Sequence, residues 1–278
     1  MLMEAEPQAH QEAASKAGEF DPGSTIMHHI MDSHEIEVPF TDMVIPLPHL
    51  QIGPVDISIT KHVVMMWIVS AILIVVFVSA ARRAKEPVPR GMRNALETLI
   101  LFIRDDVARR AIPQGADRFV PYLLTCFFFI LTCNLLGLVP GMATATGNIS
   151  VTAGLALMAF VVIQASGIRE FGIIGHLKNQ MPHVPMALVP LFIVIEFMSN
   201  LIRPFALCIR LFANMMAGHV VILAFISLVF ILGAFAAPVS VVFALFTHFL
   251  ELLVAFLQAY IFTVLTAQFI GLSVNPAH

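Results

Sequence analysis

The stretch RPFALCIRLFANMMAGH, residues 203–219, decides the fold because it sets two arginines, an asparagine and a histidine in the most apolar part of the chain. It lies within a nearly unbroken apolar run from residue 184 to residue 272. A lone guanidinium at the centre of a bilayer costs several kcal/mol on most estimates. Ionisable groups in membrane spans usually face the protein interior or water and mark functional sites. The stretch therefore predicts both a membrane protein and a site within it.

The composition of the whole chain agrees with a membrane fold. Of its 278 residues, 59% are hydrophobic and only 12% are charged, and the mean hydropathy is +0.90. These values lie far outside the range of soluble globular domains. Apolar runs long enough to cross a bilayer predict spans near 62–80, 119–138, 149–167, 186–233 and 238–272. We expect an all-α polytopic membrane protein with about five membrane helices.

The last two predicted spans are longer than a bilayer requires. A continuous helix over 186–233 would be roughly 70 Å long, against a hydrocarbon core of about 30 Å. It must therefore be strongly tilted or broken, and Pro204 and Gly218 are the candidate sites for a kink. We expect two long, strongly tilted helices that form a hairpin in the membrane.

Residues 93–112 have a different pattern, with apolar positions at helical spacing and charges between them. This pattern is typical of an amphipathic helix that lies in the membrane interface or packs against its neighbours. We expect it on the cytoplasmic side. The chain divides, in this interpretation, into a polar N-terminal extracytoplasmic segment, 1–48, and a membrane domain, 49–278.

The positions of the basic residues indicate the orientation. Nine of the 15 Lys and Arg residues lie from Arg82 to Arg118, directly after the first span. Basic loops stay in the cytoplasm, so the N-terminus is expected outside and the C-terminus inside. The N-terminus lacks the basic region and short apolar core of a signal peptide, so we expect the first span to insert by itself.

The ionisable residues of the last two spans fall into two helical stripes. From residue 179 onward the charged side chains are Glu196, Arg203, Arg210 and Glu251. At about 100° per residue, the polar positions within about 40° of Arg210 are Glu196, Ser199, Arg203 and Asn214. His219 falls near 180°, on the opposite face. The second stripe holds Thr247, Glu251 and Gln258, with His248 to one side. Two polar stripes on paired helices suggest a path for protons or small ions.

Each of these residues also has a structural interpretation. Glu196 and Arg203 could be a buried ion pair, and His248 could pack between helices. The hydroxyls of Ser199 and Thr247 could bond back to their own helix. Other chemistries find no support: the sequence has no phosphate-binding loop, no H-E-x-x-H and no cysteine pairs for zinc. We expect no cofactor, no metal and no nucleic-acid partner.

Three motifs give the chain a family resemblance: NLLGLVPG (134–141), IRLFANMMAGH (209–219) and LQAYIFTVLTAQFI (257–270). Together they resemble subunit a of the F-type ATP synthases, the stator subunit beside the rotating c-ring. The similarity extends over roughly residues 30–273. It implies a non-catalytic, proton-translocating subunit of the F0 sector, with two offset aqueous half-channels.

The resemblance also implies roles for the site residues. Arg210 matches the essential arginine that faces the c-ring carboxylate, and Asn214 and Gln258 match its polar neighbours. Glu196, with Ser199 beside it, matches the cytoplasmic exit path, where Arg203 is a structural or exit-path residue. His219 and Glu251 stand where many bacterial members have Glu and His, and with His248 they match the path from the outer side.

The implied setting is a bacterial inner membrane, with the c-ring, the subunit b stalk and the rest of the F0F1 complex as partners. Two alternatives of other classes remain. A stand-alone channel or transporter would carry its coupling groups within itself, whereas Arg210 has no carboxylate within a helical turn. A purely structural scaffold would tolerate apolar residues at 196 and 210. The His219 and Glu251 pair favours H⁺ over Na⁺ as the transported ion.

Overall fold

The computed structural model describes residues 35–37, 44–46, 51–52, 55–56, 58, 60–82, 91–139, 142, 144–180, 189–232, 235 and 237–275. Most of the predicted N-terminal segment and its boundary at residue 48 lie outside these ranges. Within them, two short pairs of antiparallel strands precede the helices. The sequence pattern did not predict these strands. Strand β1 (Glu35–Glu37) pairs with β2 (Val44–Pro46), and β3 (Gln51–Ile52) pairs with β4 (Val55–Asp56).

Five of the described helices are long and apolar enough to cross a membrane. They are α3 (Lys61–Arg82), α6 (Val120–Gly137), α7 (Ile149–Gln180), α8 (Val189–Leu232) and α9 (Ala237–Val274). Helices satisfy every backbone hydrogen bond internally, which is the requirement that the bilayer interior imposes. The prediction of an all-α polytopic membrane protein is confirmed.

Helix α8 is one long helix, as the sequence predicted, whereas α7 is longer than its predicted span. Helix α8 is helical over 44 residues with Pro204 inside it, so the alternative of a broken segment at this position is wrong. Helix α7 continues well past residue 167, and its geometry is interrupted at Gly172, which has φ 70° and ψ 171°. Glycine adopts a positive φ without the steric cost of a Cβ atom. The chain therefore bends at Gly172 where a longer side chain would be strained.

The predicted amphipathic segment consists of three consecutive pieces: α4 (Met92–Leu101), the π-helical η1 (Phe102–Ala108) and α5 (Arg109–Ala111). A short 3₁₀ turn, η2 (Ala116–Arg118), leads into α6. The apolar side chains of Ile103, Val107 and Ile112 are buried against the other helices. The sequence pattern allowed this segment either to lie in the membrane interface or to pack against its neighbours. In the structure, its second half packs against neighbouring helices.

The described residues group into two compact units. The smaller unit, Ala217–Phe249, contains the end of α8 and the beginning of α9. Within it the rings of Phe225 and Phe243 stack with centroids 5.6 Å apart. This contact joins the two helix segments as a hairpin.

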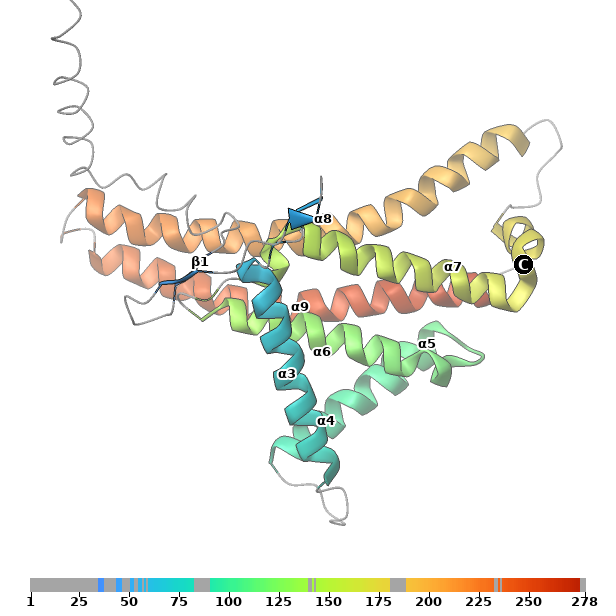
Figure 1. Cartoon of the computed structure of the whole chain (residues 1–278), viewed down its shortest axis with the longest axis horizontal. Helices are drawn as coiled ribbons and strands as arrows, with labels where there is room; N and C mark the ends of the chain where they lie inside the picture. The colour runs from blue at the N-terminus through green and yellow to red at the C-terminus, as the bar shows by residue number, and fades with distance from the viewer. Residues whose placement is uncertain are drawn as a thin grey trace, which may run out of the picture. The chain divides into compact units, whose positions relative to one another are not determined.

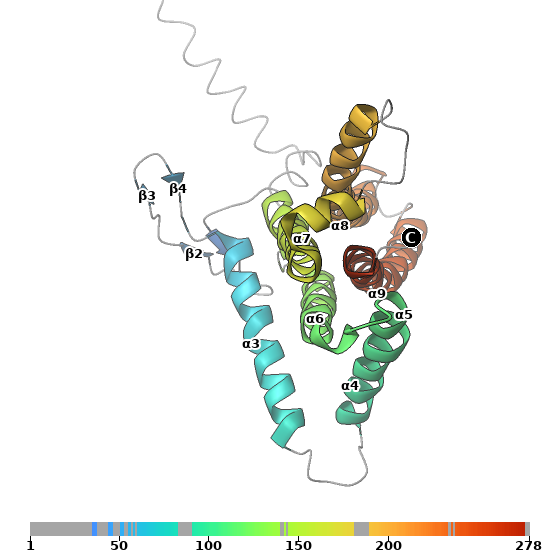
Figure 2. The same ribbon diagram turned by 90° about the vertical axis from the view of Figure 1, so that its right-hand side faces the viewer.

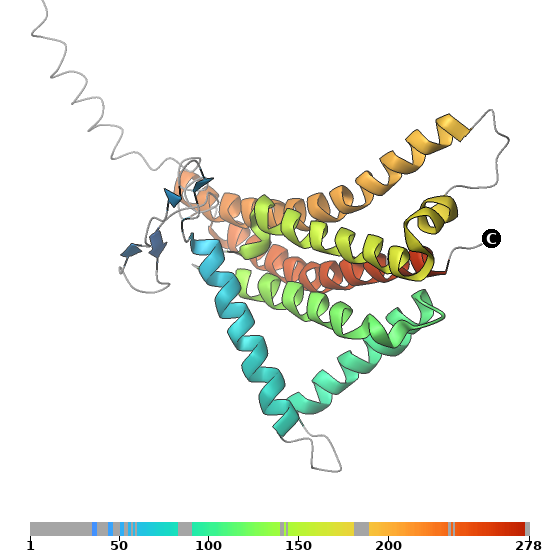
Figure 3. The same ribbon diagram turned by 45° about the vertical axis from the view of Figure 1, so that its right-hand side comes forward.

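The larger unit contains the described residues within Asp32–Met216 and Leu250–His278. Helix α6 lies at its centre, with α7 and the last part of α9 alongside (Figure 1). Helix α3 lies on one side of α6 and the α4–η1–α5 segment on another (Figure 2). The contact between α3 and α6 is closest near the start of α3, and the two helices diverge beyond it (Figure 3). The core of this unit includes the fully buried Leu123, Phe127, Leu211 and Phe262.

Candidate functional site

Arg210 lies on the exposed face of α8 and, within the described part of the chain, makes no hydrogen bond or ion pair. Its neighbours Leu207 and Leu211 are buried in the core of the larger unit. The guanidinium is always charged and has five N–H donors, so its lack of a partner inside a spanning helix is costly. The side chain is thus directed away from the core that anchors its own helix, and it is available to a group from outside this chain.

The other polar residues of this stripe lie where the buried and exposed faces of α8 meet. Leu207, Leu211 and Met215 are buried and fall between about 60° and about 140° from Arg210 around an ideal helix. The half-buried side chains between that buried arc and Arg210 are Glu196, Arg203 and Asn214, and the half-buried Ser199 falls about 20° to the other side of Arg210. The stripe predicted from spacing therefore lies along one edge of the packed surface, which is the part of a membrane helix that both protein and outside groups can reach.

Arg203 and Glu196 form the ion pair that their spacing suggested. Nη2 of Arg203 lies 3.7 Å from Oε1 of Glu196, and the side chains are 29% and 25% exposed. Arg203 also donates from Nη1 to Oδ1 of Asn200 over 3.3 Å, and its guanidinium lies over the ring of Phe269 on α9. Arg203 is thus held by several groups of this chain, whereas Arg210 is held by none that the structure describes.

The second stripe is on α9. Gln258 is buried, with 4% of its surface exposed. Both carboxylate oxygens of Glu251 are buried without a hydrogen-bond partner among the described residues. Glu251 and Gln258 are separated by about 20° around an ideal helix, so they share one face. A carboxyl group that is buried without a partner can take up or release a proton, which is the chemistry that a proton path needs.

The two predicted histidines belong to the smaller unit. His219 on α8 and His248 on α9 are both half-buried. The hydroxyl of Thr247 shows no bond back to its own helix, and neither does that of Ser199, in contrast with Thr263 and Thr266 of α9, which both bond to the carbonyl four residues earlier. The interpretation of Ser199 and Thr247 as residues that satisfy themselves within their helix is therefore wrong.

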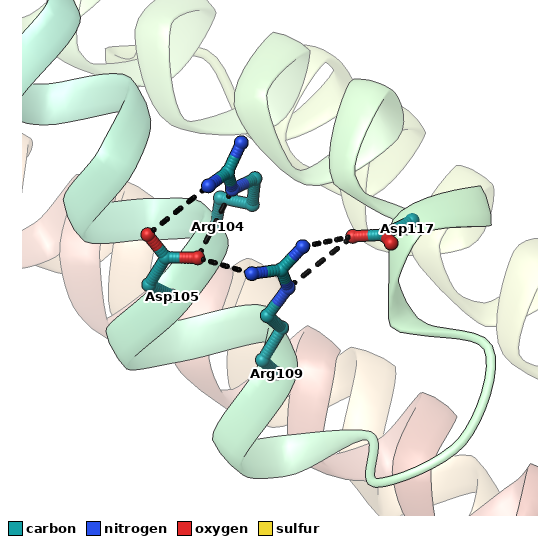
Figure 4. A network of polar contacts seen from close by, with 4 residues as sticks. All are labelled: Arg104, Asp105, Arg109 and Asp117. Atoms are coloured by element: carbon teal, nitrogen blue, oxygen red, sulfur yellow. Dashed lines mark hydrogen bonds and ion pairs between the residues drawn. The ribbon is translucent and has the colours of Figure 1, made fainter.

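A charged network that was not predicted from the sequence joins the α4–η1–α5 segment to η2 (Figure 4). Arg104 donates from Nε to Oδ1 of Asp105 over 3.0 Å, and Arg109 donates to the same oxygen over 2.9 Å. Arg109 also donates from Nη2 to Asp117 over 3.2 Å. The guanidinium of Arg104 holds the pKa of the Asp105 carboxyl below its ordinary value of 3.8. The i, i+4 spacing of Asp105 and Arg109 was the available signal.

Two buried polar side chains with hydrogen bonds were also not predicted from the sequence. Asn134, fully buried in α6, bonds to α9 and to the loop that follows α6. His176, beyond the bend in α7, lies with Nε2 2.8 Å from Oε1 of Gln164. No group of three or more His, Cys, Asp or Glu side chains in the described residues is placed to hold a metal ion. Cys126, Cys133 and Cys208 are buried free thiols.

Known proteins resemble this chain over most of its length. The family model described as ATP synthase A chain matches residues 63–271. ATP synthase subunit a of Chloroherpeton thalassium is 50% identical over 254 residues, which cover 89% of this chain and 76% of that protein. ATP synthase subunit a 2 of Prosthecochloris aestuarii is 50% identical over 273 residues, covering 95% of this chain and 84% of the relative. ATP synthase subunit a of Anaeromyxobacter dehalogenans is 45% identical over 287 aligned positions, covering 94% and 74%. With a family match across all five spanning helices and relatives this similar, the chain belongs to the ATP synthase A chain family.

Proposed function

We propose that the chain is the proton-translocating subunit a of a bacterial ATP synthase, a non-catalytic component of the membrane sector. The observation that carries the proposal is Arg210, an exposed cation on a spanning helix with no partner among the described residues. A stand-alone transporter would be expected to supply the opposing charge itself. In this proposal the counter-charge is a carboxylate of the rotating c-ring.

The arginine couples ion movement to rotation through its fixed charge. A cation beside a ring carboxylate favours the ionised form of that group, so the carboxylate releases its proton as it reaches Arg210. The same charge repels a proton that would otherwise cross directly between the two sides. Asn214 and Gln258 are the polar neighbours of Arg210 in this step.

Two separate aqueous paths bring protons to the ring and take them away. On the exit path, Glu196 with Ser199 passes protons towards the cytoplasm, and Arg203 keeps Glu196 oriented. On the entry path, His219, His248 and Glu251 take up protons from the periplasmic side. Imidazole and carboxyl groups can both bind and release protons near neutral pH when their surroundings adjust them.

The proposed setting is the inner membrane, with the N-terminus in the periplasm and the C-terminus in the cytoplasm. The partners are the c-ring, the subunit b stalk and the remainder of the F0F1 complex. The coupling ion is the proton, which the His219 and Glu251 pair supports. Replacing Na⁺ by K⁺ in the assay medium is therefore expected to leave synthesis unchanged.

The test of the proposal replaces Arg210 in the assembled complex. Arg210→Ala is expected to abolish proton-driven ATP synthesis, and Arg210→Lys to impair it strongly, since lysine lacks the planar, delocalised fork of arginine. Arg110→Ala is the matched control, because Arg110 is exposed outside the spanning helices and 76% of its side chain is accessible. Normal coupled synthesis in an assembled Arg210→Ala complex would refute the proposal, and co-purification without a ring of small two-helix proteins would favour the stand-alone transporter.

A further inference from the structure

Asn134 is a fully buried amide whose two ends bond to different parts of the larger unit. It lies in the last turn of α6 and has 0% of its surface exposed. Nδ2 donates to the backbone carbonyl of Ala255 on α9 over 3.2 Å. Oδ1 accepts from Oγ1 of Thr146 over 2.7 Å, and Thr146 is also fully buried. The two bonds use the donor and the acceptor of the amide, and they fix which way it points.

The loop after α6 is held in place for this contact. Thr146 belongs to the short turn η3 (Ala145–Gly147). Two residues earlier, Oγ1 of Thr144 lies 3.4 Å from the carbonyl oxygen of Gly137 at the end of α6. A Cβ atom at Gly137 would collide with the side chain of Thr144, so glycine provides the space for the loop to fold back. Thr146 is therefore presented to Asn134 by a loop that is itself fastened to α6.

The bond to Ala255 acts on the face of α9 that carries the candidate proton-uptake group. Glu251 is one helical turn before Ala255, about 40° away around an ideal helix, and Gln258 is about one turn after it, about 60° away in the same direction. Ala255 is itself buried, so α9 lies close against its neighbours here. A bond from a fixed amide to this carbonyl sets both the rotation of α9 about its axis and its position along that axis.

We propose that Asn134 is a positioning residue: with Thr146 it clamps α9 at Ala255 and so holds the Glu251 carboxyl in its buried site. An amide does not gain or lose protons near neutral pH, so the clamp orients a proton-transfer group without acting as one. The role of Glu251 in proton uptake rests on the proposed function. The clamp itself rests on the two hydrogen bonds.

Chemical labelling of Glu251 in the assembled complex tests the clamp without relying on proton flux. A water-soluble carbodiimide modifies accessible carboxyl groups, and mass spectrometry of α9 peptides measures the modification at Glu251. Thr146→Val keeps the shape of the side chain but removes the donor to Asn134, and Asn134→Leu removes both bonds. Each is expected to raise the labelling rate about three- to tenfold, the range expected when one interhelical hydrogen bond in a membrane is lost.

Two further variants make the result specific. Thr146→Ser retains the hydroxyl donor and is expected to label at the wild-type rate. Thr266→Val is the matched control, because Thr266 is equally buried but bonds only to the carbonyl of Phe262 in its own helix. An unchanged labelling rate in Thr146→Val, or failure of both clamp variants to assemble, would overturn the clamp.

Proton flux through the same complexes separates the clamp from the proposed function. If labelling rises and flux falls in the clamp variants, both ideas are supported. If labelling rises in the clamp variants while Glu251→Gln leaves flux unchanged, the clamp stands and the role of Glu251 in proton uptake is wrong.

Discussion

The guanidinium of Arg203 lies over the aromatic ring of Phe269, with 5.2 Å from Cζ to the ring centroid. The contact joins α8 to α9 within the larger unit. The ion pair with Glu196 is long, at 3.7 Å, so the ring is an important part of what holds the arginine. A cation placed over the face of an aromatic ring is attracted by the negative charge density of that face.

Replacing the ring of Phe269 is therefore expected to destabilise the packing of α8 on α9. Phe269→Leu removes the aromatic face and is expected to lower the free energy of unfolding by about 1 kcal/mol, whereas Phe269→Trp retains it. Thermal inactivation of the purified complex measures the difference. Phe205→Leu is the control, because Phe205 is 65% exposed on α8. Equal inactivation temperatures for Phe269→Leu and the control would show that the ring contributes nothing.

A glycine contact between α9 and the end of the amphipathic segment gives the second prediction. A Cβ atom at Gly271 would collide with the backbone carbonyl oxygen of Ala111, which cannot rotate away. Gly271→Ala is expected to cost about 1–3 kcal/mol through forced backbone movement. Gly154 in α7 has open space around its Cα atom, so Gly154→Ala is expected to be neutral or to stabilise the helix by up to about 1 kcal/mol. The amount of assembled subunit in the membrane and its thermal stability distinguish the two; a Gly271→Ala variant as stable as Gly154→Ala would contradict the close contact.

The Asp105 network makes stability depend on pH. Hydrogen bonding to Arg104 holds the pKa of Asp105 below its ordinary value of 3.8. A carboxyl with a lowered folded pKa stabilises the folded state above its unfolded pKa, and that contribution is lost as the pH falls through the folded value. Asp105→Asn is therefore expected to lower the unfolding temperature at pH 7 and to have a progressively smaller effect below about pH 4.

Thermal unfolding scans of the purified subunit at pH 7 and at about pH 3 measure this effect. Glu97→Gln is the control, because Glu97 is exposed on α4 and makes no ion pair that the structure describes. A difference between wild type and Asp105→Asn that stays constant from pH 7 to pH 3 would mean that the carboxylate charge is not what stabilises the segment.

Sequence spacing predicted the contacts that lie within one helix. Glu196 and Arg203 are two helical turns apart, so ideal helix geometry brings their side chains together. The same geometry placed Arg210 on a stripe with them but gave no partner for it, and the structure shows none in the described residues. The contacts of Asn134 were not predicted, because Ala255 is 121 residues away and the pairing depends on how the helices pack.

The bend in α7 is a second feature that could not be predicted from the sequence. Helix α7 contains four glycines, Gly154, Gly167, Gly172 and Gly175, and the bend lies at Gly172. Gly172 has a positive φ, whereas Gly154 is an ordinary helical position. His176 lies beyond the bend and packs against Gly167, where a Cβ atom would collide with its ring. Local sequence contains no record of that contact.

The proposed entry path predicts how variants of its two proton carriers combine. Glu251→Gln removes a carboxyl group that is buried without a partner in the described residues, and proton-driven ATP synthesis is expected to fall about a hundredfold, the lower range for loss of a positioned proton-transfer group. His219→Ala is expected to slow synthesis less, because water can partly replace an imidazole at a half-exposed position. If the two groups act in one path, the double variant falls no further than Glu251→Gln, since steps that work as a unit are not additive. Synthesis driven by an imposed proton gradient in vesicles measures each rate, with Leu253→Ala, 63% exposed on α9, as the control. Unchanged synthesis and proton flux in an assembled double variant would remove both residues from the path.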